Sequence, residues 1–242
     1  MLFKCKAIVI KTIDYSENSV VLKCFTDTHG VQSYMVNGVR SKKGAIKPSH
    51  LLPLSLLELE AYHQQQKNLQ RIKELKCTPP LHSLHFDMVK SAVGIFMAEV
   101  MNKVLREENQ PDAPLFSFMY HTVQLLDLEG EKVNNFPLFF LLQLTRYLGF
   151  HPKGIYSSET NGFDFREGIF EPYDVRNPYQ LAPSLSEKMS MLLQSNALEY
   201  KSVLMNYAER TAILEHTLDY YREHITGFLD LKSHKVLAEV LA

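Results

Sequence analysis

The sequence Phe3-Lys-Cys-Lys-Ala-Ile-Val-Ile-Lys-Thr-Ile-Asp-Tyr15 decides how the first third of the chain is interpreted. It is rich in β-branched residues and begins with lysines at alternating positions, a pattern that is typical of a β-strand. The polar turn 14–18 follows, and then a second strand is expected over 19–26. Asp27-Thr-His-Gly30 closes that strand tightly, and a third strand is expected over 31–39.

Two further strands are expected after a polar connection. Residues 54–62 alternate between apolar and polar side chains from Leu57 onward, and 69–77 follow the polar turn 63–68. Five strands joined mostly by short turns predict a small closed or nearly closed barrel. The OB-fold is the five-stranded architecture whose usual ligand is single-stranded nucleic acid, and the SH3-like barrel is the structural alternative.

The chain changes character after Thr78-Pro-Pro80, because prolines end a strand and the hydrophobic period then becomes helical. Helices are expected over 86–106, 114–128, 136–148, 207–225 and from residue 232. The spacing Ser184-Leu-Ser-Glu187 predicts a capping box at the start of another helix. The sequence therefore predicts an α+β protein: an OB-fold barrel over 1–80 and a helical domain over 81–242, with an irregular aromatic insertion at 151–182 in which a short hairpin is one possibility.

Charge divides the chain at the same place. The whole chain has a net charge of −1, but residues 1–80 hold 12 Lys and Arg against 6 Asp and Glu, whereas the other 162 residues hold 14 against 21. The loop 37–50 carries four cations and no acid: Arg40, Lys42, Lys43 and Lys47. Lysines on the neighbouring strands, at positions 4, 6, 11 and 23, add to this charge. The pattern predicts contact with the phosphates of a nucleic acid, without recognition of particular bases.

Other classes of function have little support in the sequence. No phosphate-binding loop, dinucleotide fingerprint, nucleophile elbow or His-Glu-x-x-His motif is present, so we expect no enzyme and no cofactor. Cys77, His82 and His85 are three potential zinc ligands where a structural site needs four. Three unpaired cysteines and a start without a secretory signal favour the cytoplasm.

Aromatic side chains would complete a platform for single strands, because bases stack on exposed rings. Tyr15 and Tyr34 are the candidates on the expected barrel. A tyrosine on so small a barrel is more often part of the core, and both interpretations stay open.

Three stretches together resemble the bacterial RecO family of DNA repair proteins. They are 11–19 with Thr26-Asp-Thr-His-Gly30; Asn37-Gly-Val-Arg-Ser41 with the lysines after it and the strand 56–60; and the C-terminal run 221–237, which contains Leu231-Lys-Ser-His-Lys235. The resemblance implies an OB-fold followed by a helical domain that binds single- and double-stranded DNA and anneals complementary strands. It also implies cooperation with RecR and with the tail of single-stranded DNA-binding protein to load RecA recombinase.

The resemblance assigns DNA binding to Arg40, Lys42, Lys43, Lys47 and Lys11, and implies no catalytic residue. Many members of the family bind zinc through four cysteines shortly after the Leu-Gly-Phe found here at 148–150, but 151–182 contains no cysteine. No metal is therefore expected, and the aromatic residues there are expected to replace the zinc as a hydrophobic staple. The alternatives are an RNA-binding or ribosome-associated OB-fold protein, a protein adaptor that does not bind nucleic acid, and a zinc-dependent nuclease.

Overall fold

The computed structural model describes residues 2–39, 46–64, 67–106, 110–130, 133–228 and 231–241. The chain divides into two compact units, Met1–Leu128 and Glu129–Ala242. The domain division expected at residue 80 stays a prediction. Among the described residues, no helix is both long enough and apolar enough to cross a membrane.

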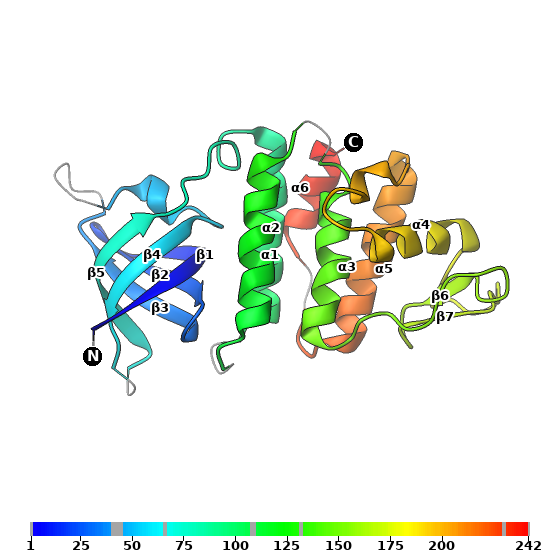
Figure 1. Ribbon diagram of the computed structural model, residues 1–242, viewed down its shortest axis with the longest axis horizontal. Coiled ribbons are helices and arrows are strands. Elements are labelled where there is room, and N and C mark those ends of the chain that lie inside the picture. The colour runs from blue at the N-terminus through cyan, green and yellow to red at the C-terminus, as the bar shows by residue number, and fades with distance from the viewer. Residues whose placement is uncertain are drawn as a thin grey trace. The chain divides into compact units, whose positions relative to one another are not determined.

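Five strands of the first unit form a closed barrel (Figure 1). They are β1 (Leu2–Ser16), β2 (Ser19–Thr26), β3 (Gly30–Asn37), β4 (Leu56–Tyr62) and β5 (Leu69–Cys77), with the short 3-10 helix η1 (Pro48–Leu51) between β3 and β4. Their order around the barrel is β1-β2-β3-β5-β4, and all pairs are antiparallel except β3 with β5. This is the strand order of an OB-fold, so the predicted fold of the N-terminal region is confirmed.

The barrel interior is filled by apolar side chains that alternate along the strands. They include Cys5, Ala7, Val9, Leu22, Cys24, Tyr34, Val36, Leu57, Leu59 and Ala61. Tyr34 is 0% exposed, and burial raises the pKa of its hydroxyl far above the usual value. Tyr34 therefore belongs to the core and cannot stack on a base.

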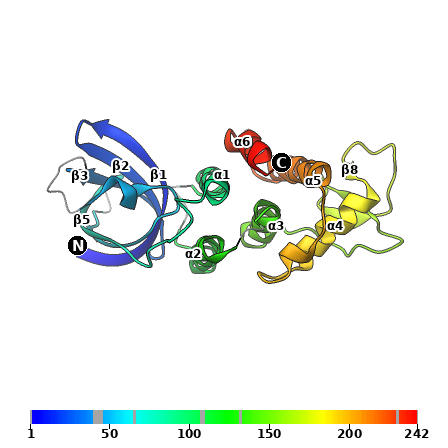
Figure 2. The ribbon, with the colours of Figure 1, turned by 90° about the horizontal axis from the view of Figure 1, so that it is seen from above.

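Two helices cover one outer side of the barrel, as Figure 2 shows: α1 (Met88–Val104) and α2 (Ala113–Leu128). Phe25 of β2 points outward on this side, is 2% exposed, and lies against Phe116 of α2 with ring centroids 5.5 Å apart. Helix α1 begins where the carboxylate of Asp87 accepts a hydrogen bond from the Lys90 backbone N–H at 2.9 Å. On this side of the barrel the helices also bury side chains that point outward, so both faces of the sheet are buried there.

Asp127, near the end of α2, anchors the segment that joins the barrel to α1. Its buried carboxylate accepts hydrogen bonds from the backbone N–H groups of His82, Ser83 and Leu84, at 2.9, 2.8 and 2.8 Å. The buried Lys90 ammonium donates to the Asp127 carbonyl oxygen at 2.9 Å. Burial alone would raise the pKa of Asp127, but these donors outweigh it and hold the pKa below its ordinary value.

The second unit is mostly helical, as predicted. Its helices are α3 (Phe136–Leu148), α4 (Pro183–Gln194), α5 (Tyr207–His224) and α6 (Ser233–Val240), with the 3-10 helix η2 (Tyr200–Ser202). Gly149, with φ +84°, ends α3 in the left-handed conformation that glycine adopts without strain. The hydroxyl of Tyr221 in α5 donates to the Leu141 carbonyl of α3 at 2.7 Å and ties the two helices together.

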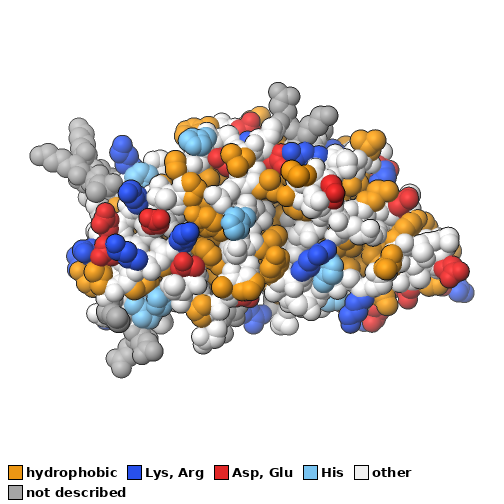
Figure 3. Space-filling view, viewed as in Figure 1, with side chains coloured by type: hydrophobic (Ala, Val, Ile, Leu, Met, Phe, Trp, Pro, Cys, Tyr) orange, Lys and Arg blue, Asp and Glu red, His pale blue; other side chains and the backbone are white. Residues whose placement is uncertain are grey.

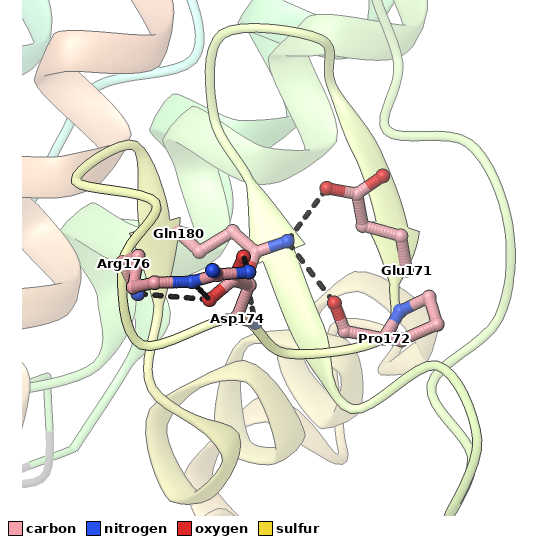
Figure 4. Close-up of polar contacts among 5 residues, drawn as sticks. All are labelled: Glu171, Pro172, Asp174, Arg176 and Gln180. Carbon is pink, nitrogen blue, oxygen red and sulfur yellow. Dashed lines mark hydrogen bonds and ion pairs between the residues drawn. The ribbon is translucent and has the colours of Figure 1, made fainter.

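The insertion at 151–182 contains the short hairpin that the sequence left as a possibility, together with a third strand. It contains a small sheet with the order β7-β6-β8, formed by β6 (Gly162–Asp164), β7 (Ile169–Glu171) and β8 (Gln180–Leu181). Figure 4 shows the Gln180 side chain joining the edges: its amide nitrogen donates to Glu171 at 2.6 Å and to the Pro172 carbonyl at 3.2 Å. Its amide oxygen accepts from the Asp174 backbone N–H at 2.7 Å, and Asp174 pairs with Arg176 at 2.9 Å.

Aromatic side chains hold this small sheet onto α5. Phe163 and Phe170 are buried with ring centroids 5.0 Å apart, and Phe163 lies 5.6 Å from the ring of Tyr220. Gly168, with φ +69°, allows the turn between β6 and β7 to approach that ring, because a Cβ there would come within 3.0 Å of Tyr220. The arrangement agrees with the hydrophobic staple expected in this cysteine-free segment.

The capping box predicted at Ser184 is wrong. Helix α4 begins at Pro183, its N-cap residue is Ala182, and no side chain caps it. Proline fills the first helical position and so removes one of the four backbone N–H groups that lack a partner at a helix start. The capping box of this unit lies instead at the start of α5, where Asn206 accepts from the Glu209 N–H at 2.9 Å and Glu209 accepts from the Asn206 N–H at 2.9 Å.

Substitution Asn206→Ala is expected to lower the free energy of unfolding by about 1 kcal/mol, because the Glu209 amide loses its partner at a helix N-terminus. Urea unfolding monitored by circular dichroism measures this change. The matched substitution Ser184→Ala, at the position where no capping bond exists, should change the free energy by less than about 0.5 kcal/mol. Equal losses in the two variants would contradict the assignment of the cap.

Candidate nucleic-acid interface

The five residues predicted to bind DNA fall into two groups. Arg40, Lys42 and Lys43 lie outside the described residues. Lys47 is exposed and forms the N-cap of η1, where its carbonyl accepts from the His50 N–H at 3.0 Å. Lys11 lies on β1 and is half-buried. Their role in binding stays a prediction, and the structure describes the residues on either side of the basic loop.

Both flanks of the loop are fixed beside the C-terminal half of β1. The backbone N–H groups of Gly38 and Val39 donate to the Asn18 carbonyl, at 2.7 and 3.2 Å, in the turn that follows β1. On the return, the Thr12 hydroxyl donates to the Leu51 carbonyl at 2.6 Å. The chain that carries the four cations therefore leaves and rejoins the barrel next to residues 12–18.

A β-bulge at Ile10 turns Lys11 outward. Residues Cys5, Ala7 and Val9 point into the barrel, so regular alternation would place Lys11 inside as well. The pairing shifts by one residue at this point: Val9 lies opposite Cys24, but Lys11 lies opposite Lys23. Lys23 points outward because its neighbours Leu22 and Cys24 point inward, and Lys11 therefore shares its outer face.

The outward residues of β1, β2, β3 and β5 form two rows across the sheet, which we call the two-row face. One row runs Lys11, Lys23, Ser33, Leu69, and the next runs Ile13, Val21, Met35, Arg71, each residue lying opposite the next. These eight residues comprise three cations and no acid. A face of this composition favours a polyanion over a protein surface of mixed charge.

The far edge of the two-row face opens into a groove of about 630 Å³, lined by Tyr62, Gln64, Lys67, Leu69, Gln70, Arg71, Ile72 and Lys73. The buried amide of Gln70 shapes this edge, because it accepts from the Gln64 N–H at 2.9 Å and donates to the Lys67 carbonyl at 2.5 Å. Lys73 pairs with Glu60 at 3.0 Å, and hydrogen bonding to that carboxylate raises the pKa of Lys73. Because Lys73 is paired with Glu60, the groove adds Lys67 to the positive charge of the two-row face, next to Arg71.

The opposite outer face, formed by β1, β4 and β5, has balanced charge. Lys4 lies opposite Glu60 and Lys6 opposite Glu58, and both pairs line a groove of about 450 Å³. Figure 3 shows cationic and anionic side chains interspersed over β4 and β5. Cross-strand neighbours of opposite charge neutralise each other, so Lys4 and Lys6 do not add to an anion site as the sequence indicated.

Of the two tyrosines considered for stacking, only Tyr15 has an exposed ring. Its side chain is 68% exposed at the end of β1, three residues before the Asn18 carbonyl that holds the loop flank. Sequence reasoning missed Arg71, because the parallel pairing of β3 with β5 joins residues that are far apart in the chain, and it missed Lys67, which joins the face only through the groove. The only local signal was the outward alternation of Arg71 along β5.

Metal ligands do not gather in the part of the chain that the structure describes: no three His, Cys, Asp or Glu side chains there lie close enough to hold an ion. The His85 ring nitrogen Nε2 lies 2.9 Å from the Pro53 carbonyl, a contact that fixes the ring against the barrel. This contact gives His85 a structural role.

Comparison with known proteins identifies the family. The family model for the recombination protein O N-terminal domain matches residues 1–80, and the model for its C-terminal domain matches 85–234. The chain is 36% identical to the DNA repair protein RecO of Flavobacterium psychrophilum, over 100% of both chains. It is 33% identical to that of Flavobacterium johnsoniae and 34% identical to that of Phocaeicola vulgatus, again over 100% of both chains. The chain therefore belongs to the RecO family.

Proposed function

We propose that this protein is a DNA repair and recombination mediator. It binds single- and double-stranded DNA through the backbone, anneals complementary strands, and helps RecR to load RecA recombinase. The relatives of the chain carry the name DNA repair protein RecO, and they match it over its full length. The observation that carries the proposal is the two-row face, whose eight residues include three cations and no acid and which adjoins the flanks of the basic loop.

Backbone contact suits annealing because the two strands of a nascent duplex repel each other. Lysine and arginine side chains neutralise phosphates, release condensed counterions, and leave the Watson–Crick edges of the bases unoccupied. Two strands held in this way meet with less repulsion and can still pair in any sequence. The proposed role requires binding and positioning, and it needs neither a cofactor nor a catalytic residue.

The partners belong to the same proposal. Residues 81–242 carry 14 Lys and Arg against 21 Asp and Glu, so they repel DNA and suit protein partners with basic surfaces. We propose RecR and the tail of single-stranded DNA-binding protein as its protein partners, without assigning residues to either contact. RecA is engaged indirectly. The cytoplasm is the expected location.

A strand-annealing assay tests the proposal. Complementary strands coated with single-stranded DNA-binding protein should form duplex much faster with this protein than without it, whereas non-complementary strands should give no duplex. Naked strands provide the second arm, because there the protein acts through charge neutralisation alone. Coated strands that anneal no faster in its presence would favour the adaptor reading, and tighter binding to RNA of the same sequence would favour an RNA-binding protein.

A further inference from the structure

We infer that the two-row face is a seat for single-stranded DNA, in which an unpaired base stacks on Tyr15 and the strand crosses β1, β2 and β3 toward Arg71 and Lys67. The inference rests on the proposed DNA binding and goes further, because it names a residue that would distinguish unpaired from paired bases.

Tyr15 occupies a second β-bulge. Asp14 lies opposite Val20 and Ser16 lies opposite Ser19, so Tyr15 is the extra residue on β1 and has no partner on β2. A bulge re-aims the side chain that it carries, and this one leaves the ring 68% exposed. Ile13, two residues earlier on the same strand, is 46% exposed. An aromatic ring and an apolar side chain thus face solvent where the basic loop is fixed.

The face has the dimensions of a short stretch of single strand. Four strands side by side, at about 4.8 Å spacing, place Lys11 about 14 Å from Leu69 across the first row. The groove that contains Arg71 and Lys67 continues the path past the last strand. Cations at both ends and apolar or small side chains between them match a strand whose phosphates and bases alternate, and single OB-folds bind about 4 nucleotides or more.

The chemistry distinguishes single from double strands. A base in a duplex is stacked on its neighbours and offers no free face, whereas an unpaired base can cover the Tyr15 ring. Phosphates, in contrast, are available in both forms of DNA. Tyr15 should therefore contribute only when unpaired bases are present, and Arg71 should contribute whenever phosphates are present.

Fluorescence anisotropy with three probes tests this assignment in the full chain: a short single strand, the same backbone built from abasic sites, and a duplex. Tyr15→Ala should weaken binding to the base-bearing single strand about tenfold and change the other two affinities by less than about twofold. Tyr15→Phe should retain binding. Arg71→Gln should weaken binding to the base-bearing and the abasic strand equally.

Phe86→Ala is the matched control, because Phe86 is an aromatic residue of the same unit, 84% exposed, and lies off the barrel sheet. It should behave as the unaltered protein, and circular dichroism should show that all variants are folded. If Tyr15→Ala binds the single strand as tightly as the unaltered protein, or loses as much affinity for the abasic probe as for the base-bearing strand, the stacking assignment is overturned. The proposed DNA binding is not overturned by either result. Unaltered protein that binds none of the probes overturns the proposed function as well, and tighter binding to an RNA strand overturns the assignment to DNA.

Discussion

Reversing the charge at two lysines of the basic loop, with Lys42→Glu and Lys43→Glu, should lower the affinity for single-stranded DNA about a hundredfold at about 0.1 M salt. Each lysine that contacts a phosphate releases a counterion, and each glutamate adds repulsion in its place. The flanks of the loop meet the barrel beside the two-row face, so the added repulsion acts on the DNA nearest the loop, within a screening length of about 10 Å at this salt concentration. Anisotropy titrations over a series of salt concentrations measure both the affinity and its salt dependence.

The salt dependence sharpens this prediction. The four cations of the basic loop alone predict a slope of log affinity against log salt near −3 on a single strand, which the cations of the two-row face make steeper, and loss of two loop contacts should make the slope shallower by about 1.4. Lys4→Glu with Lys6→Glu makes the same change in net charge on the balanced face of the same barrel. That control should weaken binding only a few-fold. Equal losses in the two double variants would show that net charge, and not the location of the charge, governs binding.

Replacing the carboxylate that anchors the joint, with Asp127→Asn, should lower the free energy of unfolding by about 3 kcal/mol. The carboxylate accepts three backbone N–H groups, whereas an amide presents one oxygen and an NH₂ group that faces a donor. Lys90 would also lose the nearby negative charge that accompanies its own burial. An acid near the C-terminal end of a helix is otherwise unfavourable, so these contacts explain why Asp127 lies there.

Urea unfolding of both proteins across a pH series measures this effect. The pKa of Asp127 is lowered in the folded protein, so its contribution is complete above the unfolded carboxylate pKa of about 3.9 and is lost as pH falls through the folded pKa. The two proteins should therefore converge in strongly acidic solution. Asp112→Asn is the control, since Asp112 accepts a single N–H from Leu115 at 2.9 Å and is less buried. A loss as large in the control would remove the special role of Asp127.

The barrel could be predicted from the sequence because each of its strands repeats a local pattern. The strands expected at 19–26 and 69–77 match β2 and β5 to the residue, and the expected end of the β4 strand at Tyr62 is also the observed one. The two-row face could not be predicted in the same way. Its rows depend on the parallel contact between β3 and β5, which forms only when the barrel closes.

For the insertion at 151–182 the sequence suggested only a possible short hairpin and placed no strand, for a different reason. Its strands are two or three residues long, too short for any period to show. They are held by side chains that satisfy the backbone, as when Asp164 accepts from the N–H groups of Arg166 and Glu167, both at 2.9 Å. Such contacts depend on single polar residues placed in three dimensions. A hydropathy pattern does not record them.

The bulge at Ile10 has a consequence for comparing this protein with its relatives. One additional residue in β1 decides whether the next cation faces solvent or the barrel core, so the strand before the bulge and the strand after it follow opposite parities. An alignment that places a gap one position away would equate a surface lysine with a core residue while still matching hydrophobic content. Loss of the bulged residue itself would leave Lys11 opposite Lys23 and facing outward, whereas an insertion or deletion in the regular part of the strand would exchange inside for outside along the rest of it.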